Sequence, residues 1–417
     1  MKKKHPAAAD HACPCISRRT IIRHAASALA LGAAGEGLSF GLTSTLARAA
    51  QETQKKNDRI LVVLELSGAN DGLNTFVPYG DPAYYKLRPR LGIAEKKLIK
   101  IDDVHGFSGG MKGFEQLYKD GKLAIVHGCG YAQPNFSHFT SMAYWHTAAP
   151  NSGQPLGWVG KLADSMSPQG APNFIVNVGE TQSLAVNASH HTPVVFNDPE
   201  HFMRKGDATV RPFFDAEDHA AQSANATQQF LLDVAKSAKE ASAQVREAWS
   251  SYKTPVDYGI VPLGLNKIAS LIAAGMPTRL YYTSYPHNVF DTHVHQADVH
   301  ARLLTYTSDA VAAFMRDMER IGRGDDVSIL IFSEFGRRAA ENDNLGTDHG
   351  TANLMYLVGK TVKGGQYGTR SSLTELMPDG NLQYTIDFRR VYATMIEGWL
   401  QHHDSAAILR GQFADGA

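Results

Sequence analysis

The sequence predicts an α/β fold in which helices cover both faces of a mainly parallel central sheet. Short apolar runs rich in β-branched residues alternate with longer stretches of helical period, as is typical of such folds. A chain of 417 residues, 43% of them hydrophobic, can bury a large core. This composition excludes disorder, collagen and coiled coil. Equal numbers of basic and acidic residues, 41 each, give no support for a nucleic-acid partner.

The apolar runs that are bounded by turn residues predict strands, and the longer periodic segments predict helices. The predicted strands are Ile60 to Leu66, Leu123 to His127, Phe174 to Val178, Arg279 to Thr283, Val327 to Phe332 and Leu354 to Val358. The predicted helices are Met111 to Lys119, Ser137 to His146, Pro155 to Ser165, Ala221 to Trp249, Leu263 to Ala274, Gln296 to Ile321 and Asp387 to Gln401.

The segment 179–218 has no clear period and is interrupted by prolines at 193, 199 and 212. We therefore expect an irregular, cap-like insertion there. Residues 50–417 are interpreted as a single domain that carries this insertion.

Residues 1–49 resemble a twin-arginine export signal. They hold seven basic and only two acidic residues, and the pair Arg18-Arg19 precedes a weakly apolar run that ends at Ala47-Arg48-Ala49. Gly32 and Glu36 are among the residues that make this run too polar for a spanning helix of about 20 apolar residues. We expect export through the twin-arginine translocase, cleavage near residue 49, a periplasmic location and no stable membrane anchor. A general-secretory signal is the alternative.

Ligands of parallel α/β sheets bind outside the carboxyl ends of the strands, so the polar clusters that follow predicted strands are candidate sites. The first cluster, residues 67–74, follows the first strand and offers Asp71 as an oxygen ligand. The alternative is an Asn-Asp-Gly turn whose side chains bind their own backbone.

The second cluster leads into a helix whose first residues predict Ser137 as the N-cap. A hydroxyl at this position feels the positive end of the helix dipole, which favours an anionic substrate and an alkoxide. Ser137 is therefore a candidate nucleophile, and a plain N-cap is the alternative.

The third cluster contains Asp291, His293 and His295. In extended chain, Asp291 and His293 lie on one side and can share a metal. If the helix has already begun, Asp291 and His295 face together instead. The alternative without function is an N-cap at Asp291 with solvated imidazoles.

The fourth region joins Ser333 and Glu334, at the end of a strand, to Arg337 and Arg338 and then to Asp348-His349 between glycines. Carboxylate and imidazole ligands suit Zn²⁺ or Mn²⁺. A guanidinium fork matches the oxygens of phosphate or sulfate. A structural turn is the alternative.

Together these segments resemble the exported DUF1501 family of bacteria over nearly all of residues 50–417. The resemblance is carried by ELSGANDGLNTFVPY, PNFSHFTSMAYWHTA, FDTHVHQ, SEFGRRAAEN, GTDHGTANLMYLVG and YTIDFRRVYATMIEGWL, in this order. The family is grouped with the alkaline phosphatase and sulfatase superfamily. The resemblance therefore implies that fold, with one or two divalent metals at the carboxyl edge of a mixed sheet.

Residue by residue, the resemblance implies metal ligands at Asp71, at Asp291 with His293 or His295, and at Asp348 with His349. It also implies that Ser137 is the nucleophile. The superfamily's late Asp-His pair directly follows a strand, whereas Ser333 and Glu334 occupy that place here. Glu334 is therefore an alternative ligand, with His349 as the last histidine. Zn²⁺ or Mn²⁺ is expected first, and Ca²⁺ or Mg²⁺ is the alternative.

The resemblance implies a metal-dependent hydrolase that acts on a small anionic ester, with Arg337 holding the transferring group. Phosphate is favoured over sulfate because the residues around Ser137 lack the context for conversion to formylglycine. The alternative is a periplasmic binding or assembly protein that keeps the fold without catalysis. A serine esterase is disfavoured because the chain has no Gly-x-Ser-x-Gly motif.

Overall fold

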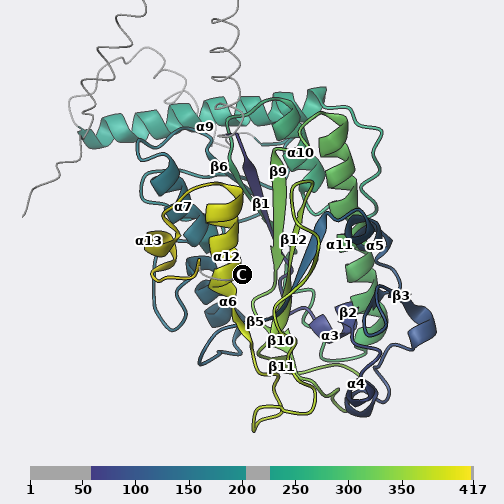
Figure 1. Cartoon of the computed structure of the whole chain (residues 1–417). Helices are drawn as coiled ribbons and strands as arrows, with labels where there is room; N and C mark the ends of the chain where they lie inside the picture. Colours follow the sequence, from purple (N-terminus) through teal and green to yellow (C-terminus); the bar gives the residue numbers. More distant parts are fainter. Residues whose placement is uncertain (1–57, 203–225, 415–417) are drawn as a thin grey trace, which may run out of the picture. The chain divides into compact units, whose positions relative to one another are not determined.

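The computed structural model describes residues 58–202 and 226–414. They belong to a compact unit that begins at Asp58 (Figure 1). The predicted export signal and residues 203–218 of the predicted insertion lie outside the described residues. No helix among those described is both long and apolar enough to cross a membrane.

A mainly parallel sheet forms the centre of the unit, as the sequence predicts. Its strands follow the order β13-β5-β12-β9-β1-β8-β6-β7, and β14 also pairs with β5. Within the described residues, every pairing of this sheet is parallel except the two that β12 makes with β5 and β9. The strands are β1 (Ile60–Glu65), β5 (Leu123–Gly130), β6 (Ile175–Val178), β7 (Val194–Phe196), β8 (Leu280–Ser284), β9 (Val327–Phe332), β12 (Asn353–Gly359), β13 (Gly365–Tyr367) and β14 (Ile386–Asp387).

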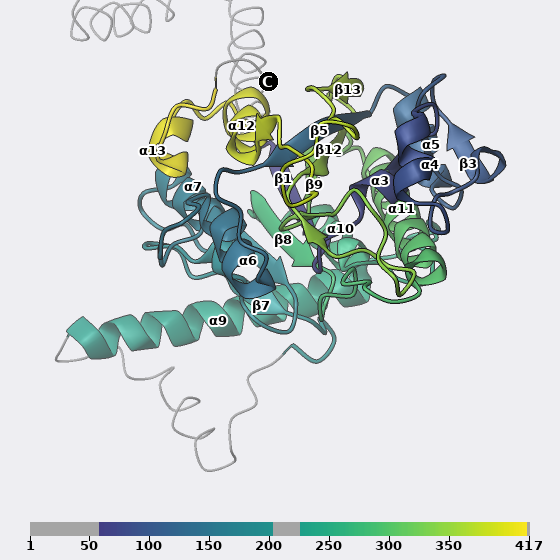
Figure 2. The same cartoon turned by 90° about the horizontal axis from the view of Figure 1, so that it is seen from below.

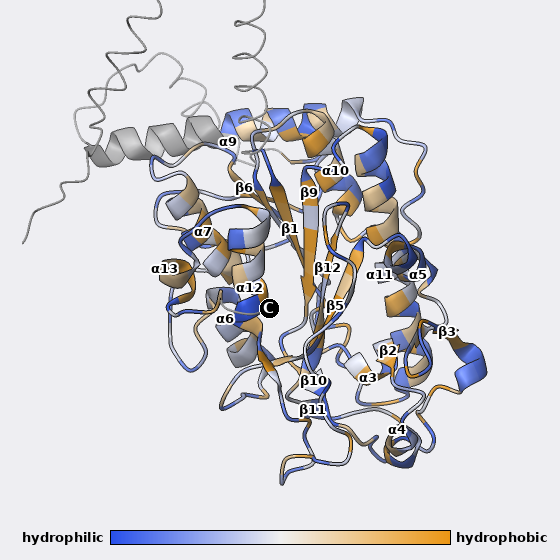
Figure 3. Ribbon diagram, viewed as in Figure 1, coloured by the Kyte–Doolittle hydropathy of each residue, from blue (hydrophilic) through white to orange (hydrophobic). Residues whose placement is uncertain are grey.

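Two hydrophobic cores lie on the two faces of the sheet, because successive side chains of a strand point to opposite sides. In β1, Val62 and Leu64 belong to one core and Leu61 and Val63 to the other. The central strands β1 and β9 are buried on both faces and are mostly hydrophobic (Figure 3).

Helices cover both faces, again as predicted (Figure 2). One face is covered by α5 (Lys112–Lys119), α9 (Ala226–Ser251), α10 (Leu265–Ala273) and α11 (Gln296–Arg320). The other face is covered by α6 (His138–Thr147), α7 (Trp158–Met166), α12 (Phe388–Ala393) and α13 (Ser405–Leu409).

The structure corrects the sequence prediction in two segments. Residues 194–196, in the predicted irregular insertion, form β7, which pairs with β6 at the edge of the sheet. The predicted helix at 387–401 starts as α12 and continues as a π-helix, Thr394–Trp399. A three-residue strand is too short for its period to be recognised, which is why β7 escaped prediction.

The remaining elements are short and escaped prediction for the same reason. A small sheet has the order β2-β4-β3, and β10 pairs antiparallel with β11. The elements are α3 (Gly72–Thr75), β2 (Phe76–Val77), α4 (Pro82–Leu87), the 3₁₀ helix Glu95–Lys97, β3 (Leu98–Lys100), β4 (Gly106–Ser108), the 3₁₀ helix Leu184–Val186, β10 (Gly336–Arg337) and β11 (His349–Gly350).

Trp145 attaches α6 to the sheet and should be a main source of stability. Its buried ring stacks on Phe332 of β9 at 5.4 Å and on Phe388 of α12 at 4.0 Å between ring centroids. We expect Trp145→Ala to lower the free energy of unfolding by about 3–5 kcal/mol, because the cavity cannot collapse between rigid neighbours. Chemical denaturation measures this change.

Phe139 provides the matched control on the same helix, since it is 89% exposed. Phe139→Ala should change the free energy of unfolding by no more than about 0.5 kcal/mol. Equal losses in the two variants would contradict the assignment of Trp145 as the anchor of α6.

Candidate metal site

Loops from four strands meet at the carboxyl edge of the sheet. His138 begins α6 after β5, Asp291 follows β8, and Glu334 follows β9. His349 lies just before β12, and because β12 runs antiparallel, its beginning lies at this same edge. Side chains that are far apart in the sequence therefore come together here.

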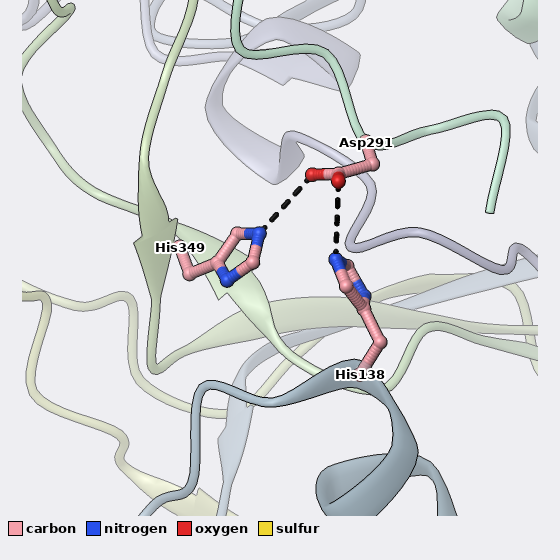
Figure 4. A group of neighbouring side chains, drawn as sticks. All are labelled: His138, Asp291 and His349. Carbon is pink, nitrogen blue, oxygen red and sulfur yellow. Dashed lines mark hydrogen bonds and ion pairs between the residues drawn. The ribbon is translucent and has the colours of Figure 1, made fainter.

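Three side chains place their metal-binding atoms around one point, and a fourth lies beside two of them. Ligand atoms of His138, Asp291 and His349 all lie within 4.8 Å of one another (Figure 4). Nε2 of His138 is 3.3 Å from Oδ2 of Asp291, and Nε2 of His349 is 3.1 Å from Oδ1. Nε2 of His293 lies 3.0 Å from Oδ1 of Asp291 and 3.0 Å from Nε2 of His349. We call these four residues the Asp291 cluster.

An oxygen atom holds the other ring nitrogen of each histidine. Nδ1 of His138 lies 2.6 Å from Oε1 of Glu334, and Nδ1 of His349 lies 2.8 Å from the carbonyl oxygen of Phe136. Nδ1 of His293 is 3.4 Å from Oδ1 of Asp348, a longer contact. When a cation is bound, the proton of each ring is expected on Nδ1, which leaves the Nε2 lone pair facing the cluster. Metal-binding histidines are oriented by such partners.

The electrostatics of the Asp291 cluster favour a carboxylate surrounded by positive charge. Burial opposes ionisation of Asp291, but hydrogen bonds from His138, His349 and Arg337 outweigh it, so the pKa of Asp291 lies below its usual value. Burial likewise lowers the pKa of His138, yet contacts with Asp291 and Glu334 prevail and raise it to about 9. In the absence of a cation, a proton on His138 balances these two carboxylates.

Two observations show that the residues fit a divalent metal. Nε2 of His138 is buried and faces Oδ2 of Asp291 at 3.3 Å, so a cation between them would take the place of the proton that they share. With their protons on Nδ1, His293 and His349 would point two lone pairs at each other across 3.0 Å, which a cation between them would relieve. Three imidazoles and one carboxylate form a ligand set that suits tetrahedral Zn²⁺ and is compatible with Mn²⁺.

Glu334 lies behind His138 and does not reach the centre of the cluster. Its carboxylate is buried and accepts hydrogen bonds from the backbone N–H of Gly68 at 2.9 Å and from the hydroxyl of Ser333 at 3.1 Å. Gly68 has a φ of +109°, and a Cβ there would lie 2.5 Å from the carbonyl oxygen of Asn288. The glycine therefore lets the loop pass close to the backbone of Asn288 while its N–H binds Glu334, and Glu334 in turn orients His138.

Asp71, the early ligand that the sequence suggests, is engaged elsewhere. Its buried carboxylate pairs with Arg88 at 2.6 Å and accepts a hydrogen bond from Nε2 of Gln296 at 2.5 Å. Burial would raise the pKa of Asp71, but Arg88, His300 and Gln296 together lower it. Asp71 also caps α3. Its ligand atoms are not among those that converge.

Arg337 contacts the cluster from the buried side and does not face the solvent from which a substrate would arrive. Its side chain is fully buried and donates to the carbonyl oxygens of Gly68 and Ala69, and to those of Thr347 and Phe290. It also donates to Oδ1 of Asp291 at 2.8 Å. We expected Arg337 to hold the oxygens of the transferring group, and its burial removes it from that position. Its neighbour Arg338 is exposed.

Ser137 is the N-cap of α6, as predicted. Its exposed hydroxyl makes no capping hydrogen bond in the described structure, and it directly precedes His138.

Asp291 and His293 face each other in non-helical chain, because α11 begins only at Gln296. His295 occupies the exposed N-cap position of α11, outside the cluster.

His138 was not among the sequence-derived site residues. The sequence offers one signal for it, since an imidazole next to a helix N-cap at the carboxyl edge is well placed for a metal. The partner that orients it, Glu334, lies 196 positions away, so spacing alone could not reveal the pair.

A family model described as "Protein of unknown function (DUF1501)" matches residues 58–411. The chain belongs to this family. A search of curated proteins finds no similar sequence for this DUF1501 protein.

Several solved structures are similar to parts of this DUF1501 protein. A protein in the alkaline phosphatase superfamily from Vibrio parahaemolyticus has a TM-score of 0.42 and 10% identity, covering 86% of this chain and 70% of that one. The C-terminal periplasmic domain of EcEptC from Escherichia coli has a TM-score of 0.39 and 10% identity, covering 86% and 88%. PsFucS1 sulfatase from Pseudoalteromonas sp. has a TM-score of 0.37 and 11% identity, covering 78% and 67%. Likenesses this weak carry no argument about activity.

The Asp291 cluster should bind metal in the purified protein. We expect about one equivalent of Zn or Mn per chain when no chelator or affinity metal is used. His349→Ala and Asp291→Asn should lose it, because each removes a converging ligand. Elemental analysis measures the content, and circular dichroism confirms that the variants fold.

His190→Ala is the matched control, since His190 is exposed and lies outside the cluster. Its metal content should equal that of the unchanged protein. An equal metal content in His349→Ala would exclude the cluster as the binding site.

Glu334 should act on the metal through His138. We expect Glu334→Gln to weaken metal binding by about 10- to 100-fold, the usual cost of losing a partner that orients a ligand. Competition with a calibrated chelator measures the affinity. Exposed Glu375 gives the control Glu375→Gln, which should leave the affinity unchanged. A loss as complete as that in His349→Ala would make Glu334 a direct ligand.

Proposed function

We propose that this DUF1501 protein is an exported, metal-dependent hydrolase of phosphate esters that works at the Asp291 cluster. One observation carries the proposal. Three imidazoles, each with its Nδ1 held by an oxygen, converge through Nε2 on one ionised carboxylate at the carboxyl edge of the sheet. Zn²⁺ or Mn²⁺ is the metal that these ligands favour.

When bound, such a cation supplies Lewis acidity toward a phosphoryl oxygen and lowers the pKa of the attacking group. The chain's own residues prepare the site for it. Glu334 and the carbonyl of Phe136 keep protons on the Nδ1 atoms of His138 and His349. Arg337 fixes the carboxylate of Asp291 from the buried side. These contacts orient the side chains before substrate arrives, so little reorganisation is needed.

Ser137 is the nucleophile that we propose. Its hydroxyl is exposed, free of a capping bond and next to His138 at the positive end of the α6 dipole. In the first step, Oγ forms a bond to phosphorus and loses its proton. The bond from phosphorus to the ester oxygen breaks, and the alcohol leaves with a proton. Water then cleaves the phosphoserine to release phosphate and restore Ser137.

The substrate that we propose is a small anionic ester. Asp291 keeps 31% of its side chain exposed and His293 39%, so the cluster is open to solvent. Arg338, exposed on the same loop as Asp348, is the cation that we assign to the substrate's negative charge. Its backbone N–H donates to the carbonyl oxygen of Asp348 at 2.9 Å, which keeps it beside the cluster. Phosphate is preferred to sulfate because the residues around Ser137 lack the context for conversion to formylglycine, which sulfatases need.

One observation favours the second candidate, a periplasmic binding or assembly protein. Among the described residues, only the four side chains of the Asp291 cluster converge, whereas a two-metal phosphatase needs about six protein ligands. Asp71 and Glu334, which would have completed such a set, are bound to other groups. In this case the metal would have a structural role, and no turnover would depend on it.

Ser137→Ala separates these candidates. We expect it to retain the metal and to lower the turnover of p-nitrophenyl phosphate by roughly 10³-fold or more, since loss of a nucleophile costs up to about 10⁶-fold. Mass spectrometry of the quenched reaction should find phosphate on Ser137 in the unchanged protein.

Ser250→Ala, at an exposed residue of distant α9, is the control and should turn over normally. Unchanged turnover in Ser137→Ala would eliminate the covalent route and make water the nucleophile. If a metal-loaded protein shows no turnover with any phosphate ester, the second candidate replaces the first.

A further inference from the structure

An apolar cavity lies between the sheet and the C-terminal helices, far from the Asp291 cluster. Its volume is about 460 Å³. On the sheet side it is lined by Ala124 of β5 and Leu357 of β12. Ser328, near the beginning of β9, also lines it, so the cavity lies toward the amino edge of the parallel strands. The Asp291 cluster lies at the carboxyl edge, so the two sites are separate.

The opposite wall comes from α12 and the π-helix that continues it, beside the sheet (Figure 1). Val391, Met395 and Trp399 turn apolar atoms toward the sheet. Gly398 also lines the cavity, and a Cβ there would meet nothing closer than 4.0 Å. The wall therefore leaves space that its own side chains do not fill. Single π-helical turns are frequent at functional sites.

The charged groups that line the cavity are cationic. Arg59 and Lys363 line it, and among its lining residues, all within the described ranges, none is acidic. The guanidinium of Arg59 lies 5.0 Å from the Trp399 ring and donates through Nη1 to the carbonyl oxygen of Trp399. This contact holds Arg59 beside the apolar wall, and within the described residues Nε and Nη2 make no hydrogen bond. Lys363 is exposed.

Inside the cavity wall, one polar atom lacks a partner. Oγ of Ser328 is buried and makes no hydrogen bond within the described residues. Thr361, Tyr367 and Thr394 also line the cavity, but the Tyr367 and Thr394 hydroxyls donate to backbone carbonyls, so a water molecule in the cavity would find few free partners. Ligand pockets of about 300–1,000 Å³ have this composition, with mostly apolar walls and a few polar groups that fix orientation.

We propose that this cavity binds a single-chain amphiphile with an acidic head, a fatty acid. The hydrocarbon chain lies between the sheet and the π-helix, and the carboxylate lies between Arg59 and Lys363. An apolar wall and two cations at its mouth complement these two parts of one ligand. This binding site is independent of the proposed function at the Asp291 cluster.

The test is isothermal titration of the purified full chain, freed of bound lipid, with octanoate, decanoate, dodecanoate and tetradecanoate below their micellar concentrations. Burial of one methylene is worth about fourfold in affinity, so successive acids should bind about 15-fold more tightly until the cavity is filled. The affinity should then level off. Absence of binding by all four acids would overturn the proposal.

Variants test the two parts of the site. Ala124→Leu fills the cavity and should weaken dodecanoate binding by about tenfold or more. If it fails to fold, Thr394→Phe in the opposite wall takes its place.

The two cations are tested separately. Dodecanoate should bind more tightly than dodecanol, and the double variant Arg59→Gln/Lys363→Gln should abolish this preference. Lys360→Gln is the control, because exposed Lys360 pairs with Asp325 outside the cavity.

Binding that neither the cavity-filling variant nor the double variant alters would show only adventitious binding and overturn the proposal. A chain that begins at Asp58 and binds dodecanoate, when the full chain does not, would show that a preceding segment occupies the cavity. That result would also overturn the proposal. Loss of turnover at the Asp291 cluster leaves these outcomes unaffected, so the two proposals fail separately.

Discussion

The direction of β12 is the constraint on which the site depends. In a purely parallel sheet, the residues before a strand lie at the edge opposite to those after it. Because β12 runs antiparallel between β5 and β9, His349 reaches the edge where His138 and Asp291 emerge. The pairing of β10 with β11 sets Arg337 opposite His349, which continues the same geometry into the loops. Reversal of this one strand thus brings the ligands together.

Charge compensation then organises the loops around Asp291. Arg337 is buried beneath it and binds carbonyl oxygens from three separate chain segments, so one guanidinium both holds the loops and balances the carboxylate. The residues that contact the outer nitrogens of two histidines are also acidic. Glu334 contacts Nδ1 of His138, and Asp348 contacts Nδ1 of His293. Carboxylates behind imidazoles strengthen them as ligands and favour binding of a cation at the centre.

The network around Asp71 supports the site without belonging to it. Asp71 accepts a hydrogen bond from the side-chain amide of Gln296, and Oε1 of the same amide accepts one from the hydroxyl of Thr347 at 2.6 Å. Thr347 immediately precedes Asp348-His349, so the ion pair between Asp71 and Arg88 is linked to the loop that carries a ligand. A buried pair of this kind is strongly destabilising when one partner is removed. Asp71, in the first polar cluster that the sequence shows, therefore helps to position the loop that carries His349.

The sequence by itself determined the α/β class, the six main strands and the helices on both faces, because each of these follows from the period of apolar residues in a local window. It also located Asp291, His293 and His349 near strand ends. Only the tertiary structure decided which of the polar groups meet. His138 joins the site, while Asp71 is buried against Arg88 and Arg337 supports Asp291 from the buried side. These outcomes depend on contacts between residues far apart in the chain and on the direction of β12, and neither leaves a periodic signal in the sequence.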